Sequence, residues 1–363
     1  MDDGSLLAQR LLEVVNDGKR DATYKLALLL ALIDWAMSNP DQDRIMTREL
    51  ASSVFAIYFR QLERFTDRFG RDIVLRQGAQ KKVLILDSVA GVRERNPGIR
   101  QMGGLRRQDP RGVQRTIDTI ERTLVAQPIP RLQRVGDKVV PFLYNCGWEP
   151  KQPLGPLRRD ERDFIQLIDG VGERLVVFGP LIRPVIEQFW VTDVAKWSGI
   201  TTEEERLRVH LFGRNRSSFP GALRRGLTEL QEGVCFYCAA KLGSSSPIDH
   251  FVPWSRYPND SVENLIVGCI SCNAKKSDHL VSARFVRKWI VRSDEPLLTK
   301  LALETNWEAN PARAKGVVVS AYRSVAVGSV LWDGTEGFRV LEKEGLREIR
   351  SVLEVLGPGS SAV

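Results

Sequence analysis

Two cysteine pairs constrain this chain more than any other feature of its sequence. Cys235-x-x-Cys238 and Cys269-x-x-Cys272 are separated by thirty residues. A tight C-x-x-C turn places two thiolates on one side of a metal ion, and a second such turn completes a tetrahedral site without an open position. A redox dithiol is disfavoured because the pairs lack a thioredoxin-like context. The spacing therefore predicts a structural zinc site, whose binding energy stabilises a small fold.

A histidine lies between the cysteine pairs, directly after an acidic residue. The chain has only three histidines, and His250 and His279 both lie in or beside the cysteine-rich segment. Residues 247–252 have the pattern of a β-strand, in which neighbouring side chains point to opposite faces. Asp249 and His250 can therefore take different roles at one site. Further polar residues follow in the same segment: Asn264, Asn273, Lys275 and Lys276.

The order of these residues resembles that of the HNH endonucleases, which have a ββα-metal fold. The resemblance rests on Cys-x-x-Cys, Asp-His, Pro253, Asn264-Leu265 and Cys-x-x-Cys-Asn-x-x-Lys within residues 235–280. The stretches DHFVPWSRYPND, ENL and SCNAKKSDHL look like those of bacterial HNH proteins with a long helical N-terminal region. The nuclease motif is specific, whereas the rest of the chain is similar only in patterning.

The resemblance implies a role for each matching residue. His250 would act as the general base that takes a proton from water, and Asp249 would be the acidic metal ligand beside it. Asn264 would brace the loop after the first strand and so orient the histidine. Asn273 stands at the last position of the motif, which gives an H-N-N pattern, and would be the second metal ligand. Oxygen ligands from Asp and Asn suit Mg²⁺ or Mn²⁺ better than zinc.

Each of these residues also has a structural interpretation. A histidine such as His250 can fill a core or cap a helix, and Asp249 can stabilise a turn. Asparagines are common in loops and at helix ends, so Asn273 can be a cap rather than a ligand. The residues alone leave these interpretations open beside the catalytic ones.

The basic residues predict a polyanionic partner. The formal net charge is +8, which favours nucleic acid. Contacts to a phosphate backbone fix position without reading bases, and this suits the basic approach to the cysteine-rich segment. A solvated helix face is the alternative for the same residues. The candidate phosphate contacts are Arg224, Arg225, Arg256, Lys275 and Lys276.

Hydrophobic periodicity predicts an α+β protein that is mostly α. The expected order begins with a helical N-terminal domain (1–92), a basic linker (93–115) and a mixed, mainly helical middle region (116–200). An HNH ββα-metal nuclease domain with a structural four-cysteine zinc (201–290) and a helical C-terminal region with a flexible tail (291–363) would follow. The linker prediction rests on clustered arginines, glycines and prolines.

Local patterns predict individual elements. Residues 22–37 are apolar almost all round, so we expect a helix at the centre of the N-terminal core. Asp109-Pro110 predicts a helix start, with aspartate as N-cap and proline in the first turn. Residues 173–197 predict a kinked helix or a helix pair, because prolines interrupt them. Further helices are expected at 47–69, 78–92, 280–292 and 311–327.

The function expected from the motif is metal-dependent hydrolysis of DNA, with phage defence or restriction suggested by family association. A non-catalytic, zinc-stabilised nucleic-acid-binding protein is one alternative, and an HNH nuclease acting on RNA is another. We expect double-stranded DNA as partner, with a protein partner or a second copy on the helical regions. The acidic N-terminus is unlike a signal peptide, and residues 26–37 are too few to cross a bilayer, so we expect a cytoplasmic protein without membrane contact.

Overall fold

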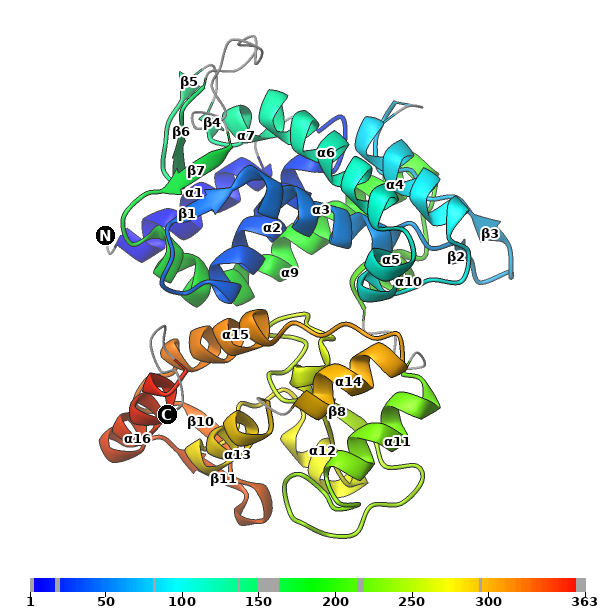
Figure 1. Cartoon of the computed structure of the whole chain (residues 1–363). Coiled ribbons are helices and arrows are strands. Elements are labelled where there is room, and N and C mark those ends of the chain that lie inside the picture. Colours follow the sequence, from blue (N-terminus) through cyan, green and yellow to red (C-terminus); the bar gives the residue numbers. More distant parts are fainter. Residues whose placement is uncertain are drawn as a thin grey trace. The chain divides into compact units, whose positions relative to one another are not determined.

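The computed structural model describes residues 3–16, 20–80, 83–135, 138–148, 163–213, 219–293 and 296–356. Helices dominate this part of the chain, and its strands form small antiparallel sheets (Figure 1). The predicted α+β class, mostly α, is confirmed. The expected flexible tail at residues 357–363 lies outside the described residues.

Internal contacts divide the chain into two compact units. Unit 1 comprises Met1–Ala36 and Asp41–Asn215, and unit 2 comprises Met37–Pro40 and Arg216–Val363. This division is coarser than the five regions expected from the sequence. The segment 93–115 packs within unit 1, and the C-terminal helices share unit 2 with the cysteine-rich segment.

Unit 1 consists mainly of helices. They are α1 (Asp3–Asn16), α2 (Tyr24–Ser38), α3 (Thr47–Gln61), α4 (Leu84–Arg95), α5 (Met102–Gln108), α6 (Pro110–Ala126), α7 (Pro128–Arg131), α9 (Val171–Ser198) and α10 (Glu204–Phe212). An antiparallel sheet has the order β1-β7-β6, with β1 (Arg44–Met46), β7 (Phe164–Leu167) and β6 (Tyr144–Cys146). Two hairpins pair β2 (Phe65–Thr66) with β3 (Asp72–Ile73) and β4 (Arg134–Val135) with β5 (Lys138–Val139).

Helices α2 and α9 supply much of the core of unit 1. Residues 26–33 of α2 are at most 2% exposed, so this helix takes the central place expected from its all-round apolarity. Helix α9 continues through two internal prolines as one helix. By length and composition, α9 is the one described helix that could cross a membrane. In unit 1, however, its Trp190 is fully buried and its Arg183 forms an ion pair with Asp34 of α2.

The basic segment 93–115 is not the loop that its composition predicted. It contains the end of α4, all of α5 and the start of α6. Buried Met102, Leu105 and Val113 anchor these helices in the core of unit 1. The Asp109 side chain accepts a hydrogen bond from the Gly112 N–H at 2.7 Å, which is the predicted N-cap of α6. Regular apolar spacing therefore outweighs a high content of arginine, glycine and proline.

Unit 2 combines helices with two strand pairs. Its helices are α11 (Gly221–Leu230), α12 (Ile270–Lys276), α13 (Ala283–Ser293), α14 (Pro296–Glu304), α15 (Pro311–Arg323) and α16 (Lys343–Glu354), with 3-10 turns at η1 (Val262–Asn264) and η2 (Gly334–Glu336). The antiparallel pairs are β8 (Ile248–His250) with β9 (Leu265–Val267), and β10 (Val330–Trp332) with β11 (Phe338–Val340). Elements β8, β9 and α12 follow one another in the order strand, strand, helix.

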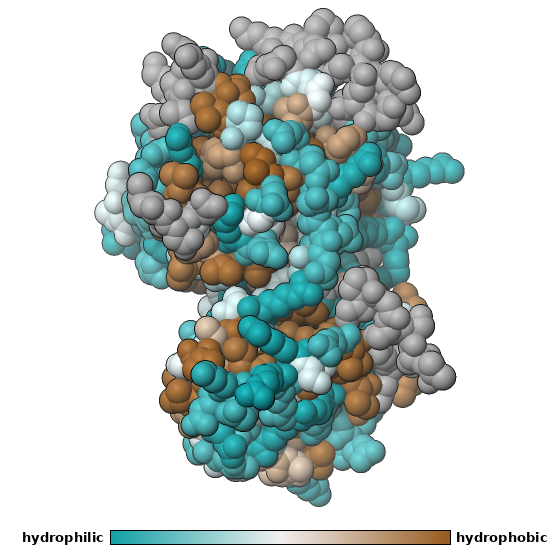
Figure 2. All heavy atoms as spheres, turned by 90° about the vertical axis from the view of Figure 1, so that its left-hand side faces the viewer, coloured by the Kyte–Doolittle hydropathy of each residue, from teal (hydrophilic) through white to brown (hydrophobic). Residues whose placement is uncertain are grey.

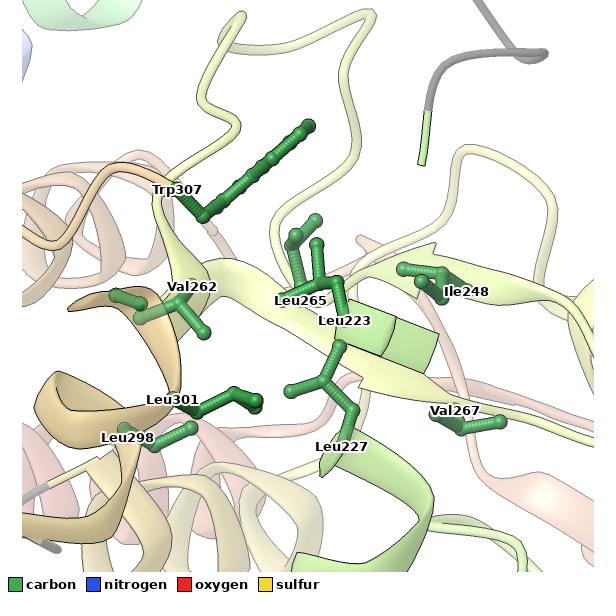
Figure 3. Close-up of a cluster of buried hydrophobic side chains, with 10 residues drawn as sticks. Leu223, Leu227, Ile248, Val262, Leu265, Val267, Leu298, Leu301 and Trp307 are labelled. Carbon is green, nitrogen blue, oxygen red and sulfur yellow. The ribbon is translucent and has the colours of Figure 1, made fainter. Parts of the chain in front are cut away.

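A hydrophobic cluster supports one side of the β8–β9 pair. Apolar side chains from α11, both strands and α14 point toward one another (Figure 3). Full burial of each such side chain contributes about 1.5–3 kcal/mol. The members labelled in the figure are Leu223, Leu227, Ile248, Val262, Leu265, Val267, Leu298, Leu301 and Trp307. The surface contrasts with this core: on the face drawn in Figure 2, hydrophilic residues are spread over both units between smaller apolar patches.

Candidate metal centre and nuclease site

The four paired cysteines form one cluster in unit 2. All four Sγ atoms lie within 4.8 Å of one another, and the Sγ atoms of Cys238 and Cys269 are 3.8 Å apart. Zinc with Zn–S bonds of about 2.3 Å holds its sulfurs about 3.8 Å apart in a tetrahedron. Cys269 is the N-cap of α12 and Cys272 lies in its first turn. The donor set and spacing fit a structural zinc ion, which would tie the turn after α11 to the start of α12.

Hydrogen bonds and a nearby cation would stabilise negative charge on the sulfur atoms of this cluster. Backbone N–H groups donate to sulfur, from Cys269 to Cys235 at 3.2 Å and from Cys272 to Cys269 at 3.4 Å. Burial raises the pKa of the Cys235 and Cys272 thiols. At Cys269, burial is outweighed by hydrogen bonds with Cys272, Cys238 and Cys235, which together lower the pKa. Burial lowers the pKa of Lys288, the charges of Cys235 and Cys238 oppose this shift, and its Nζ donates to the Phe236 carbonyl at 2.6 Å. Its positive charge would offset that of zinc-bound thiolates.

Strand β8 presents the two motif residues side by side. In the β8–β9 pair, Asp249 lies opposite Ile266 and His250 opposite Leu265, so their side chains leave the strand on different faces. Both residues are buried, with Asp249 3% and His250 0% exposed. Ionisable groups this deep need partners, because burying an unpaired charge is costly.

The Asp249 carboxylate has two partners, and both contact the same oxygen. The Tyr237 hydroxyl donates to Oδ2 at 2.7 Å, and Lys276 Nζ lies 3.1 Å from it. Burial, reinforced by Asp249, raises the pKa of Tyr237 well above its ordinary value, so this hydroxyl remains a donor. The arrangement leaves Oδ1 as the carboxylate oxygen that a metal ion would use.

Lys276 is an interior residue, which corrects the expectation that it contacts phosphate. Its side chain is fully buried in an ion pair with Asp249, and its Nζ donates to the His250 carbonyl at 2.8 Å. Both interactions join the C-terminal end of α12 to β8. The neighbouring Lys275 is exposed and remains a candidate for phosphate.

The His250 ring has one bonded and one unbonded nitrogen. Nε2 lies 2.8 Å from Oδ1 of Asp260, and Nδ1 is a buried atom without a hydrogen-bond partner. The rings of Phe219 and Trp254 pack against the imidazole, with centroid distances of 6.0 and 5.4 Å. A buried polar atom left unsatisfied requires an explanation, and a catalytic role is one of the recurrent ones.

Asn264 closes the loop that follows β8. Its Oδ1 accepts from the Val252 N–H at 2.9 Å, and its Nδ2 donates to the carbonyls of Val252 at 3.2 Å and Asn259 at 3.0 Å. The side chain is 1% exposed, so these bonds form in a dry environment where they are strong. The hydrogen bonds close the loop, and the orienting role that the resemblance implies for Asn264 stays a prediction.

Asn273 lies near Gly268, which follows β9 at the end of the strand pair where β8 begins. It is half-buried in the first turns of α12. A Cβ placed on Gly268 would lie 3.6 Å from the Tyr237 ring and 3.7 Å from the Asn273 Cβ. Gly268 therefore has two neighbours, Asn273 and the ring of Tyr237, whose hydroxyl contacts Asp249.

The remaining basic candidates differ in exposure. Arg225 is exposed and Arg256 is half-buried. Arg224 is half-buried and donates to the Ser246 carbonyl, so at least part of its guanidinium serves the fold. Arg225, Arg256 and Lys275 therefore remain predictions as phosphate contacts.

Sequence reasoning missed two residues that complete the site. Asp260, in the loop closed by Asn264, lies within hydrogen-bond distance of His250. Tyr237, between the two cysteines of the first pair, donates a hydrogen bond to Asp249. An acid ten residues after His250 was a visible signal for Asp260. No local pattern marked Tyr237, because its role depends on how the cysteine turn packs on β8.

The zinc prediction can be tested with two cysteine variants. Cys272→Ser should remove the metal and destabilise unit 2, because structural zinc binding contributes directly to folding free energy. Cys146→Ser, outside the cluster, should keep about one zinc per chain. Metal content by atomic spectroscopy and thermal unfolding measure both effects. Equal zinc content in the two variants would contradict the assignment.

The buried ion pair can be tested with two adjacent lysines. Lys276→Met leaves Asp249 buried without its cation and should lower the free energy of unfolding by about 3–5 kcal/mol. Lys275→Met, at an exposed position of the same helix, should change it by less than about 0.5 kcal/mol. Denaturant unfolding of both variants gives the comparison, and similar values for the two would refute the proposed importance of the pair.

Comparison with known proteins places this site in a family. Residues 235–282 match a family model described as HNH endonuclease. No curated protein and no solved structure matches the chain. The match covers the cysteine cluster, both strands and α12, and so contains the residues on which the resemblance was based. The segment that contains the four-cysteine cluster is thus similar to the HNH endonuclease family.

Proposed function

We propose that the protein is a metal-dependent endonuclease that hydrolyses phosphodiester bonds of DNA. The observation that carries this proposal is His250, held rigidly in β8 beside Asp249 with a buried Nδ1 that has no partner. A neutral imidazole nitrogen with a free lone pair can take a proton from water at neutral pH.

The residues around His250 give the base its orientation. Asp260 contacts Nε2, and Asn264 ties Val252 to Asn259 so that the loop between His250 and Asp260 keeps its shape. A water held at Nδ1 would be deprotonated as it attacks phosphorus. The expected products carry a 5′-phosphate and a 3′-hydroxyl.

Asp249 and Asn273 fit a hard divalent cation, Mg²⁺ or Mn²⁺. The donor set comprises Oδ1 of Asp249, whose charge is already balanced on Oδ2 by Lys276, and the amide oxygen of Asn273. So few protein ligands suit a cation that keeps several waters and binds phosphate oxygens. When bound, it would stabilise negative charge on the phosphate and on the leaving oxygen.

The charge of the protein supports a nucleic-acid backbone as substrate. The formal net charge is +8, and Arg225 and Lys275 are exposed cations on the helices that flank the strand pair. Contacts of this kind bind duplex DNA without reading its sequence. By family association, we propose phage defence or restriction as the biological role.

Cleavage of supercoiled plasmid tests this function. Wild-type protein with Mg²⁺ or Mn²⁺ should give relaxed or linear DNA, and EDTA should abolish the reaction. His250→Ala should lower the rate by about 100-fold or more, because general base catalysis contributes roughly that much. His279→Ala is the matched control, since this histidine packs against Phe338 rather than in the site, and it should cleave like wild type.

Two results would overturn the proposal. Equal cleavage by His250→Ala and wild type would remove the histidine mechanism. Binding to DNA that weakens with salt, with no cleavage under any metal condition, would identify a binding protein instead. A parallel assay with single-stranded and duplex RNA shows whether RNA is the substrate in place of DNA.

A further inference from the structure

We propose that Asp260 is the positioning residue that fixes the proton of His250 on Nε2, and that Trp307 holds Asp260 in place from outside the matched nuclease segment. The catalytic consequence rests on the proposed nuclease function, because the freed Nδ1 is the atom that would act as base. The tautomer itself is a property of the folded protein and can be measured without substrate.

The hydrogen-bond geometry selects one tautomer. An ionised carboxylate only accepts hydrogen bonds, so the 2.8 Å contact between Asp260 Oδ1 and Nε2 requires a proton on Nε2. A neutral imidazole carries one proton, and Nδ1 then keeps its lone pair. The opposite tautomer would set a lone pair against the carboxylate and leave a buried N–H without an acceptor at Nδ1.

Three hydrogen bonds fix the backbone around Asp260, one at Asp260 and two at its neighbour Asn259. The indole Nε1 of Trp307 donates to the Asp260 carbonyl at 2.6 Å. On the other side, Asn259 accepts from the Ser261 N–H at 3.0 Å through its side chain, and its carbonyl accepts from Asn264 at 3.0 Å. The carboxylate therefore sits on a backbone segment fixed before and after it.

Trp307 lies beyond the segment that matches the nuclease family, residues 235–282. It follows α14, is 3% exposed and belongs to the hydrophobic cluster on the β8–β9 pair. Its ring also packs near Phe219, which contacts the His250 imidazole. The part of unit 2 that follows the matched segment thus contributes to the surroundings of His250.

Nitrogen-15 NMR of histidine-labelled full-length protein tests the tautomer. With three histidines in the chain, the signal that disappears in His250→Ala identifies His250. Wild type at pH 7.5 should show a protonated Nε2 and an unprotonated Nδ1. His210 serves as internal reference, because its Nε2 lies 3.1 Å from a carbonyl oxygen, that of Glu63, and must carry the proton.

Replacement of Asp260 tests its role. Asp260→Asn should convert the His250 signal to a mixture of tautomers and lower kcat by about 100-fold or more, with KM within about 2-fold, as expected when a base is no longer held in one tautomer. Asp260→Glu should restore part of the wild-type tautomer population of His250 and part of kcat. Asp278→Asn, an exposed acid after α12, should behave like wild type, and all three variants should keep their zinc.

The results separate this inference from the proposed function. A proton on Nδ1 of wild-type His250, an imidazolium at pH 7.5, or an unchanged tautomer and kcat in Asp260→Asn would each overturn the role of Asp260. If wild type shows the expected tautomer and yet cleaves no nucleic acid, the nuclease proposal fails while the assignment of the Asp260–His250 pair stands.

Discussion

The junction between β8 and α12 is the constraint on which the site depends. The buried pair of Asp249 with Lys276 makes it at the end of α12, and the cysteine cluster ties the start of the same helix to the turn after α11. A helix of seven residues has little stability of its own. With both ends fixed, the helix positions Asn273, and Lys276 supports both the Asp249 carboxylate and the His250 backbone.

A second constraint acts on the other face of the strand. Asn264 closes the loop after β8, Asp260 reaches back to the imidazole, and Trp307 fixes the Asp260 carbonyl. The Asp249 side and the His250 side of the site are thus organised by separate sets of contacts on opposite faces of one short strand. Because adjacent strand residues point in opposite directions, this separation would let the dipeptide serve the two chemical roles that we propose for it.

Local sequence patterns predicted the features that depend on spacing along the chain. The two C-x-x-C pairs gave a compact cluster, Asp109-Pro110 began a helix, and the apolar residues 26–33 were buried. The failures involve competition between local composition and packing. The charges and glycines of residues 93–115 predicted a linker. Three buried apolar side chains instead hold this segment in helices. Lys276 acquires its role only when α12 folds onto β8, and nothing beside it in the chain signals that partner.

The central claim is that a water activated at His250 attacks phosphorus. Cleavage of a defined duplex in ¹⁸O-labelled water, followed by mass spectrometry of the product ends, tests it most directly. We expect one ¹⁸O atom in each new 5′-phosphate and an unlabelled 3′-hydroxyl. Products that end in 3′-phosphate, or 5′-phosphates without the label, would contradict it.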